Sequence, residues 1–83
     1  MYYLTIDNIV FVNNREEKEI PIYSILTLNK IHVSKSSLNL NDMIFDINGS
    51  VGIIKEIKNN SCIILVVSLN KKSDNESSIM SFK

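Results

Sequence analysis

The chain has 83 residues, with nine basic and nine acidic side chains that give a formal net charge of zero. A chain of this length has a small core, and we expect residues 1–83 to form a single domain. A protein that neutralises several nucleic-acid phosphates usually carries a basic excess, so zero charge disfavours a nucleic-acid partner. The longest apolar run, Cys62–Val67, is far shorter than the roughly 20 residues of a membrane-spanning helix, so we expect no membrane partner.

The residue composition favours β-structure. Isoleucine occurs fourteen times and valine six times, whereas alanine, the strongest helix former, is absent. β-branched side chains pack well on a pleated surface, so this bias predicts an all-β protein. The N-terminus lacks the basic and apolar regions of a signal peptide, and the single cysteine excludes an intramolecular disulfide. We therefore expect synthesis in a reducing cytoplasm.

The N-terminal quarter of the chain predicts one strand and one charged loop. Tyr2–Ile6 alternates in polarity, as a half-buried strand does. Asp7 and Asn8 can turn or bulge the chain before the short apolar run Ile9–Val12, so we expect one long bent strand or a tight hairpin. Residues 13–19, NNREEKE, contain no apolar side chain and predict a solvent-facing loop.

The next segment, Ile20–Val33, again has strand character. Pro21 lies near its start and lacks a backbone N–H, which favours an edge position. The apolar residues change parity along this segment, so a bulge or turn near Asn29 and Lys30 is needed for them to face one core. Ser34–Leu40 predicts a polar loop whose two leucines point inward.

A β-hairpin is predicted after this loop. Met43–Ile47 and Val51–Ile57 are the two strands, and Asn48 with Gly49 between them predicts a type I′ turn, in which both central residues need a positive φ. Gly52 interrupts the return strand, and a glycine there is typical of a bulge or of the corner of a small barrel.

A second turn at Lys58–Ser61 leads to Cys62–Leu69, which we expect to be a central strand covered on both faces. The tail 70–83 is polar but ends in an apolar patch that we expect to dock, formed by Ile79, Met80 and Phe82. Short strands and regular turns together predict a small, partly open barrel or sandwich of about six or seven antiparallel strands, SH3-like in character.

No arrangement of residues indicates catalysis. His32 alternates outward from its strand without a second metal ligand nearby, and Cys62, in an apolar strand, is interpreted as a buried free thiol. Three carboxylates are interpreted as turn formers or cross-strand partners: Asp42, Asp46 and Glu56. We therefore expect no catalytic, metal-binding or cofactor-binding residues, and a protein that is not an enzyme.

Four aromatic residues allow two interpretations: Tyr2, Tyr3, Tyr23 and Phe45. A stacking platform for single-stranded nucleic acid is one, but it needs flanking basic residues that the N-terminal half mostly lacks. Packing in the core or in a subunit interface is favoured.

The stretch N-D-M-I-F-D-I-N-G-S-V-G-I-I-K-E-I-K-N-N combines an apolar strand, Asp-x-Asn-Gly, an apolar-Gly pair and alternating hydrophobic residues. In this pattern Leu40–Val67 resembles a short β-module of accessory structural proteins of tailed bacteriophages, found in head fibres, capsid decoration proteins and tail appendages. Asn41 stands where glycine is usual in that module. The resemblance implies a virion protein that binds a capsid or tail lattice, as an oligomer or in many copies, after synthesis in the host cytoplasm.

Under this hypothesis the contacts come from the two ends of the chain, where a free strand edge can pair with a partner through its backbone. The expected interaction residues are Tyr2, Tyr3, Leu4, Ile79, Met80 and Phe82, and Asn48, Gly49 and Gly52 are expected to have structural roles in turns. Two alternatives stay open. The segment is also similar to SH3-like barrels of the KOW type, which implies contact with RNA or RNA polymerase, and the chain's size fits a small inhibitor of a host defence enzyme.

Overall fold

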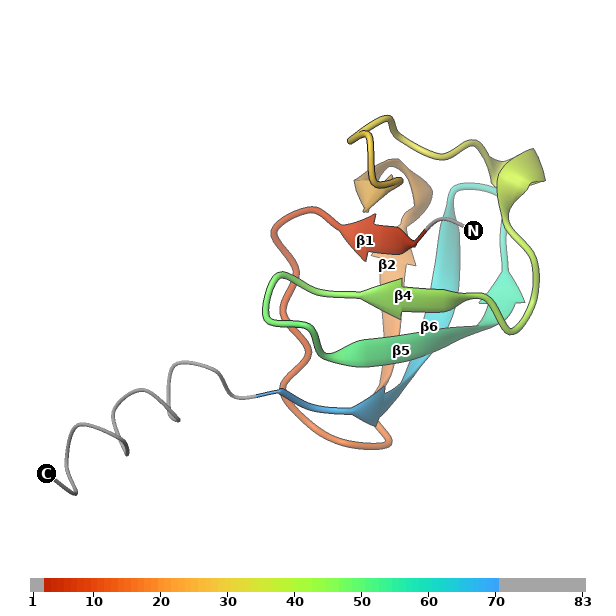
Figure 1. Cartoon of the computed structure of the whole chain (residues 1–83). Coiled ribbons are helices and arrows are strands. Elements are labelled where there is room, and N and C mark those ends of the chain that lie inside the picture. The colour runs from red at the N-terminus through yellow and green to blue at the C-terminus, as the bar shows by residue number, and fades with distance from the viewer. Residues whose placement is uncertain (1–2, 71–83) are drawn as a thin grey trace, which may run out of the picture.

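The computed structural model describes residues 3–70, which form one six-stranded sheet that curls into a half-barrel (Figure 1). The strands are β1 (Leu4–Ile6), β2 (Glu17–Pro21), β3 (Ile25–Leu26), β4 (Met43–Phe45), β5 (Val51–Ile57) and β6 (Ser61–Ser68). Two short 3-10 helices, η1 (Ile22–Ser24) and η2 (Lys35–Ser37), lie in the connections. The strand order is β2-β6-β5-β4-β1-β3. The predicted all-β fold with a small, partly open barrel is confirmed.

One pair of strands differs from the prediction, because β1 and β4 run parallel, with Leu4 opposite Ile44. The other pairs are antiparallel. Parallel neighbours need a long connection between them. Here that connection contains β2, both 3-10 helices and β3. The expectation of antiparallel strands throughout is therefore wrong for this pair.

The core lies on the inner face of the curled sheet. Alternate residues of β1, β4, β5 and β6 point into it, as strand geometry requires, and the apolar ones are Leu4, Ile6, Ile44, Ile54, Cys62, Ile64 and Val66. Other segments complete this core with Phe11, Ile20, Ile22, Ile25, Val33 and Leu38. Only one of the two leucines expected to point inward from the Ser34–Leu40 loop does so, because Leu40 is exposed.

The β5–β6 hairpin has the predicted organisation. β5 spans Val51–Ile57 as expected, and in the turn Lys58 N donates a hydrogen bond to Ser61 O at 2.8 Å. The register shifts between Val51 and Gly52, which confirms a bulge at this glycine, and it shifts again between Ile54 and Glu56.

β6 is central but is not covered on both faces. One face carries the buried side chains of Cys62, Ile64 and Val66, whereas Ile63 and Leu65 on the other face are half-buried. Nothing within residues 3–70 forms a second layer over that face (Figure 1). The prediction of full coverage is therefore wrong for one face.

The turn at Asn48 and Gly49 is confirmed, but its type is not I′. Asp46 N donates to Ser50 O at 3.0 Å and Gly49 N donates to Asp46 O at 3.1 Å. Within this turn only Gly49 has a positive φ, of 87°. This is a three-residue hairpin loop with glycine in the left-handed region. The loop lets one oxygen of the Asp46 carboxylate accept hydrogen bonds from the N–H groups of both Asn48 and Ser50.

The segment after β1 forms neither the predicted long strand nor a hairpin. β1 ends at Ile6, Asn8 has a φ of 64°, and Ile9–Val12 is irregular. Phe11 turns into the core, and its N–H donates to Asp46 Oδ2 at 2.9 Å instead of to a neighbouring strand.

The charged run 13–19 is only partly a loop, because Glu17–Glu19 belong to β2 and pair with Ile63–Leu65 of β6. Four of the five side chains of this edge strand are exposed or half-buried, and Ile20 alone is buried. A strand with a single buried side chain has no apolar alternation, so its sequence is that of a charged loop although it forms a strand.

The predicted strand Ile20–Val33 is interrupted by η1. Pro21 lies in β2 at the edge of the sheet, as predicted. The expected turn near Asn29 and Lys30 is also confirmed, since Lys30 N donates to Thr27 O at 2.9 Å and Lys30 has a φ of 62°. This turn brings His32 opposite Leu26 of β3.

Candidate functional site: the outer apolar face

The outer face of the curled sheet carries a cluster of apolar side chains outside the core. Met43 of β4 lies opposite Ile53 of β5, and Ile53 lies opposite Leu65 of β6, so the three share one face. Met43 is 52% exposed. We call this cluster the outer apolar face and define it by Tyr3, Leu28, Met43, Phe45, Ile53 and Leu65. A contiguous apolar patch of this kind is typical of a protein interaction site.

An aromatic pair forms one end of the outer apolar face. The rings of Tyr3 and Phe45 meet edge to face, with centroids 5.3 Å apart. Together with Thr5 and Leu28 they line a shallow hollow of about 330 Å³. The Thr5 hydroxyl donates to Leu26 O at 3.4 Å, so this polar group is already partnered. The hollow therefore suits an apolar side chain.

The predicted interaction residues have different positions in the structure. Tyr3 is 49% exposed on the outer apolar face, whereas Leu4 is 3% exposed in the core and offers no side-chain contact. β1 lies between β4 and β3, so it is not a free sheet edge. The other predicted residues lie outside the described range: Tyr2, Ile79, Met80 and Phe82.

Three of the four aromatic residues lie within the described range, and these three do not form one platform. Tyr3 and Phe45 are together, but Tyr23 lies on η1 and is 71% exposed, and it does not line the hollow.

The outer apolar face also contains Met43, Ile53 and Leu65, which the sequence does not predict as interaction residues. The sequence does contain one indication of this face. Ile53 and Ile54 are consecutive and both apolar, so β5 has an apolar side chain on each of its two faces.

The predicted roles of the carboxylates are partly correct. Asp42 accepts a hydrogen bond from Asn39 N at 2.9 Å, as a turn former does. Asp46 is also at a turn, but it is buried, and its carboxylate accepts three backbone N–H groups. Across residues 3–70 no group of three or more His, Cys, Asp or Glu side chains is arranged to hold a metal ion.

Cys62 is a buried free thiol, as predicted. Burial raises its pKa from 9.0 to about 11. The thiolate is the reactive form of cysteine, so this thiol is a poor nucleophile at neutral pH. His32 lies opposite Leu26 at the other end of the sheet order, on the far side of β1 from β6.

We expect Cys62 to resist alkylation in the folded protein. At pH 8 a thiol with a pKa of about 11 is roughly a hundredfold less ionised than one with a pKa of 9.0, and burial also blocks the reagent. Labelling with iodoacetamide should therefore be at least about a hundredfold slower in buffer than in 6 M guanidinium chloride, by mass spectrometry. Rapid, complete labelling of the folded chain would contradict the buried position.

Comparison of the chain with protein-family models, with curated proteins and with solved structures found no match. Among the helices of the described part of the chain, none is long and apolar enough to span a membrane. The function therefore has to be inferred from the outer apolar face and from the sequence.

Proposed function

We propose that this chain is a non-enzymatic accessory protein of a bacteriophage virion, which binds a capsid or tail lattice through its outer apolar face. The observation that carries the binding part of the proposal is the exposure of large apolar side chains on one side of the sheet. Tyr3, Met43 and Leu28 are 49%, 52% and 57% exposed. Tyrosine is among the residues that contribute most strongly to protein interfaces.

The virion part of the proposal rests on the resemblance of Leu40–Val67 to the phage β-module. In the structure this stretch contains β4 and β5 and all but the end of β6. These strands supply four of the six residues of the outer apolar face, Met43, Phe45, Ile53 and Leu65. The resemblance and the apolar face thus concern the same part of the sheet. A lattice offers many equivalent sites, so the chain would bind in many copies. It would first be made in the host cytoplasm.

A nucleic-acid partner receives less support. It needs lysines that are free to contact phosphates, yet Lys58 Nζ is 3.6 Å from Glu19 Oε2 and Lys18 Nζ is 3.8 Å from Glu16 Oε2. These two lysines therefore already have an anionic partner in place of a phosphate.

The proposal is tested by co-sedimentation with purified virus particles, with separated heads and tails as two arms. Wild-type chain should sediment with one of them, and Tyr3→Ser should weaken this association by about tenfold or more, because a buried interface tyrosine is often worth about 2 kcal/mol. Tyr23→Ser is the matched control. It removes a more exposed tyrosine from η1 that does not line the hollow beside Tyr3, and it should leave association unchanged.

Two results would contradict the proposal. One is the absence of the chain from purified virions by mass spectrometry. The other is equal association of the Tyr3→Ser and Tyr23→Ser variants. Binding to RNA or DNA that weakens steeply with added salt would instead favour the KOW-type alternative.

A further inference from the structure

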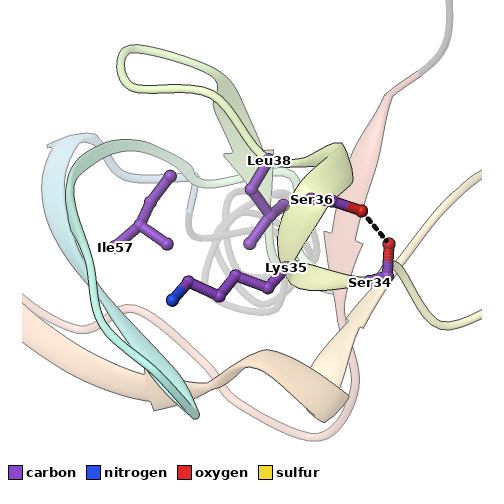
Figure 2. Close-up of a pocket in the computed structure, with 5 residues that line it drawn as sticks. All are labelled: Ser34, Lys35, Ser36, Leu38 and Ile57. Carbon is purple, nitrogen blue, oxygen red and sulfur yellow. Dashed lines mark hydrogen bonds between the residues drawn. The ribbon is translucent and has the colours of Figure 1, made fainter.

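A second hollow lies at the end of the half-barrel, between η2 and the last residue of β5 (Figure 2). It has a volume of about 660 Å³ and is lined by Ser34, Lys35, Ser36, Leu38 and Ile57. Ile57 lies opposite Cys62, whose side chain is in the core, so the hollow does not belong to the outer apolar face. Its ligand would bind independently of the proposed lattice contact.

The polar group best placed to bind a ligand here is the ammonium of Lys35. Its Nζ donates a hydrogen bond to Asn59 Oδ1 at 3.2 Å, across the gap between η2 and the β5–β6 turn. Asn59 is uncharged, and the residues that line the hollow include no carboxylate. An ammonium has three N–H donors, so this bond holds the side chain in place without neutralising its charge.

The serine hydroxyls are not available to the same ligand group as Lys35. Ser34 Oγ lies 3.1 Å from both Ser36 Oγ and Ser37 Oγ, and Figure 2 shows the Ser34 and Ser36 hydroxyls on the other side of η2 from the Lys35 ammonium. The remaining lining is apolar, with Leu38 buried and Ile57 half-buried. Figure 2 shows the Lys35 side chain extending between Ile57 and the η2 backbone. A positive charge therefore lies beside an apolar floor.

We propose that this hollow binds an acidic side chain that is adjacent to an apolar one on a partner protein. The carboxylate would accept hydrogen bonds from Lys35 Nζ, and the apolar neighbour would pack against Leu38 and Ile57. Charge complementarity selects an anion over a cation here. Inorganic phosphate fits less well, because a single lysine is paired with an apolar floor that phosphate cannot cover.

The test uses two dipeptides as probes, acetyl-Glu-Leu-amide and acetyl-Gln-Leu-amide, with ¹⁵N-labelled full-length chain. The glutamate peptide should shift the backbone amide resonances of residues 34–38 and 57, with a dissociation constant in the millimolar range. Lys35→Gln should weaken this binding by about two- to fivefold, as expected for one exposed charged contact. Lys58→Gln is the matched control and should have no effect, because Lys58 pairs with Glu19 outside the lining of the hollow.

Further measurements distinguish a site for an acidic and apolar pair of side chains from a general anion site and from the outer apolar face. Binding should weaken from about 50 to 500 mM salt, since an exposed charge pair is screened. Equal binding of the glutamine peptide, no binding of either peptide, an unchanged affinity in Lys35→Gln, or shifts confined to the outer apolar face would each overturn the proposal. Displacement of the glutamate peptide by equimolar inorganic phosphate would overturn it too, in favour of a general anion site.

Discussion

Asp46→Ala should lower the free energy of unfolding by about 3 kcal/mol, because it removes the acceptor of three backbone hydrogen bonds. The carboxylate is 5% exposed, and it accepts from Phe11 N at 2.9 Å, Asn48 N at 2.8 Å and Ser50 N at 2.9 Å. Hydrogen bonds to a charged acceptor are the stronger ones, and an unpaired buried N–H costs about 1–3 kcal/mol. Urea denaturation followed by circular dichroism measures the change.

The loss of stability is expected to be large because the Asp46 carboxylate connects two separate segments of the chain. One oxygen closes the loop between β4 and β5, and the other holds the segment that carries Phe11 into the core. Asp42→Ala is the control, because its carboxylate accepts a single exposed N–H from Asn39 and its loss should cost less than about 1 kcal/mol. Equal losses from Asp42→Ala and Asp46→Ala would contradict the burial of the Asp46 carboxylate.

The parts of the fold that are predictable from sequence have local signals. β5 and β6 are long, apolar and separated by a polar turn, and Asn48 with Gly49 marks the turn before them. Gly52 predicts the bulge in β5, because a glycine inside a strand often marks a bulge or a close approach of another group. These signals need no knowledge of distant residues, which is why the β5–β6 hairpin agrees with the prediction.

The parts that are not predictable depend on distant partners. Glu17–Glu19 form a strand because the backbone of β6 pairs with them. Their charged side chains do not predict a strand. β1 pairs with β4 in parallel across most of the first half of the chain. Propensity and periodicity describe a residue's own segment and not its neighbour in space.

The candidate site shows the same division. Alternation places Tyr3 and Leu4 on opposite faces of the sheet, but the direction of the core decides which of the two is exposed, and the sequence does not show it. Asp46 was recognisable as a turn residue, while its burial depends on Phe11, which arrives from 35 residues away. The outer apolar face needs the register of β4, β5 and β6 before its members can be placed together.

Gly52→Ala should destabilise the fold by about 2–3 kcal/mol through overpacking, which commonly costs 1–3 kcal/mol in a well-packed core. A Cβ at this position would overlap Ile64 Cγ2 and would lie 3.2 Å from two carbons of the Phe11 ring. Both neighbours are buried, and Cγ2 is attached directly to the β-carbon of Ile64, so it cannot move aside cheaply. Thermal and urea denaturation should both report the loss.

Ile64→Leu provides the control, because leucine has no methyl group on its β-carbon at the point of overlap and has the same volume. Alone, this change should cost less than about 1.5 kcal/mol, as volume-conserving substitutions usually do. In the double variant Gly52→Ala, Ile64→Leu, the overlap is relieved, so the combined loss should be smaller than the sum of the two single losses by about 1 kcal/mol or more. Strict additivity would contradict the overlap with Ile64 Cγ2 as the cause of the loss, since Gly52 has no positive φ that would itself require glycine.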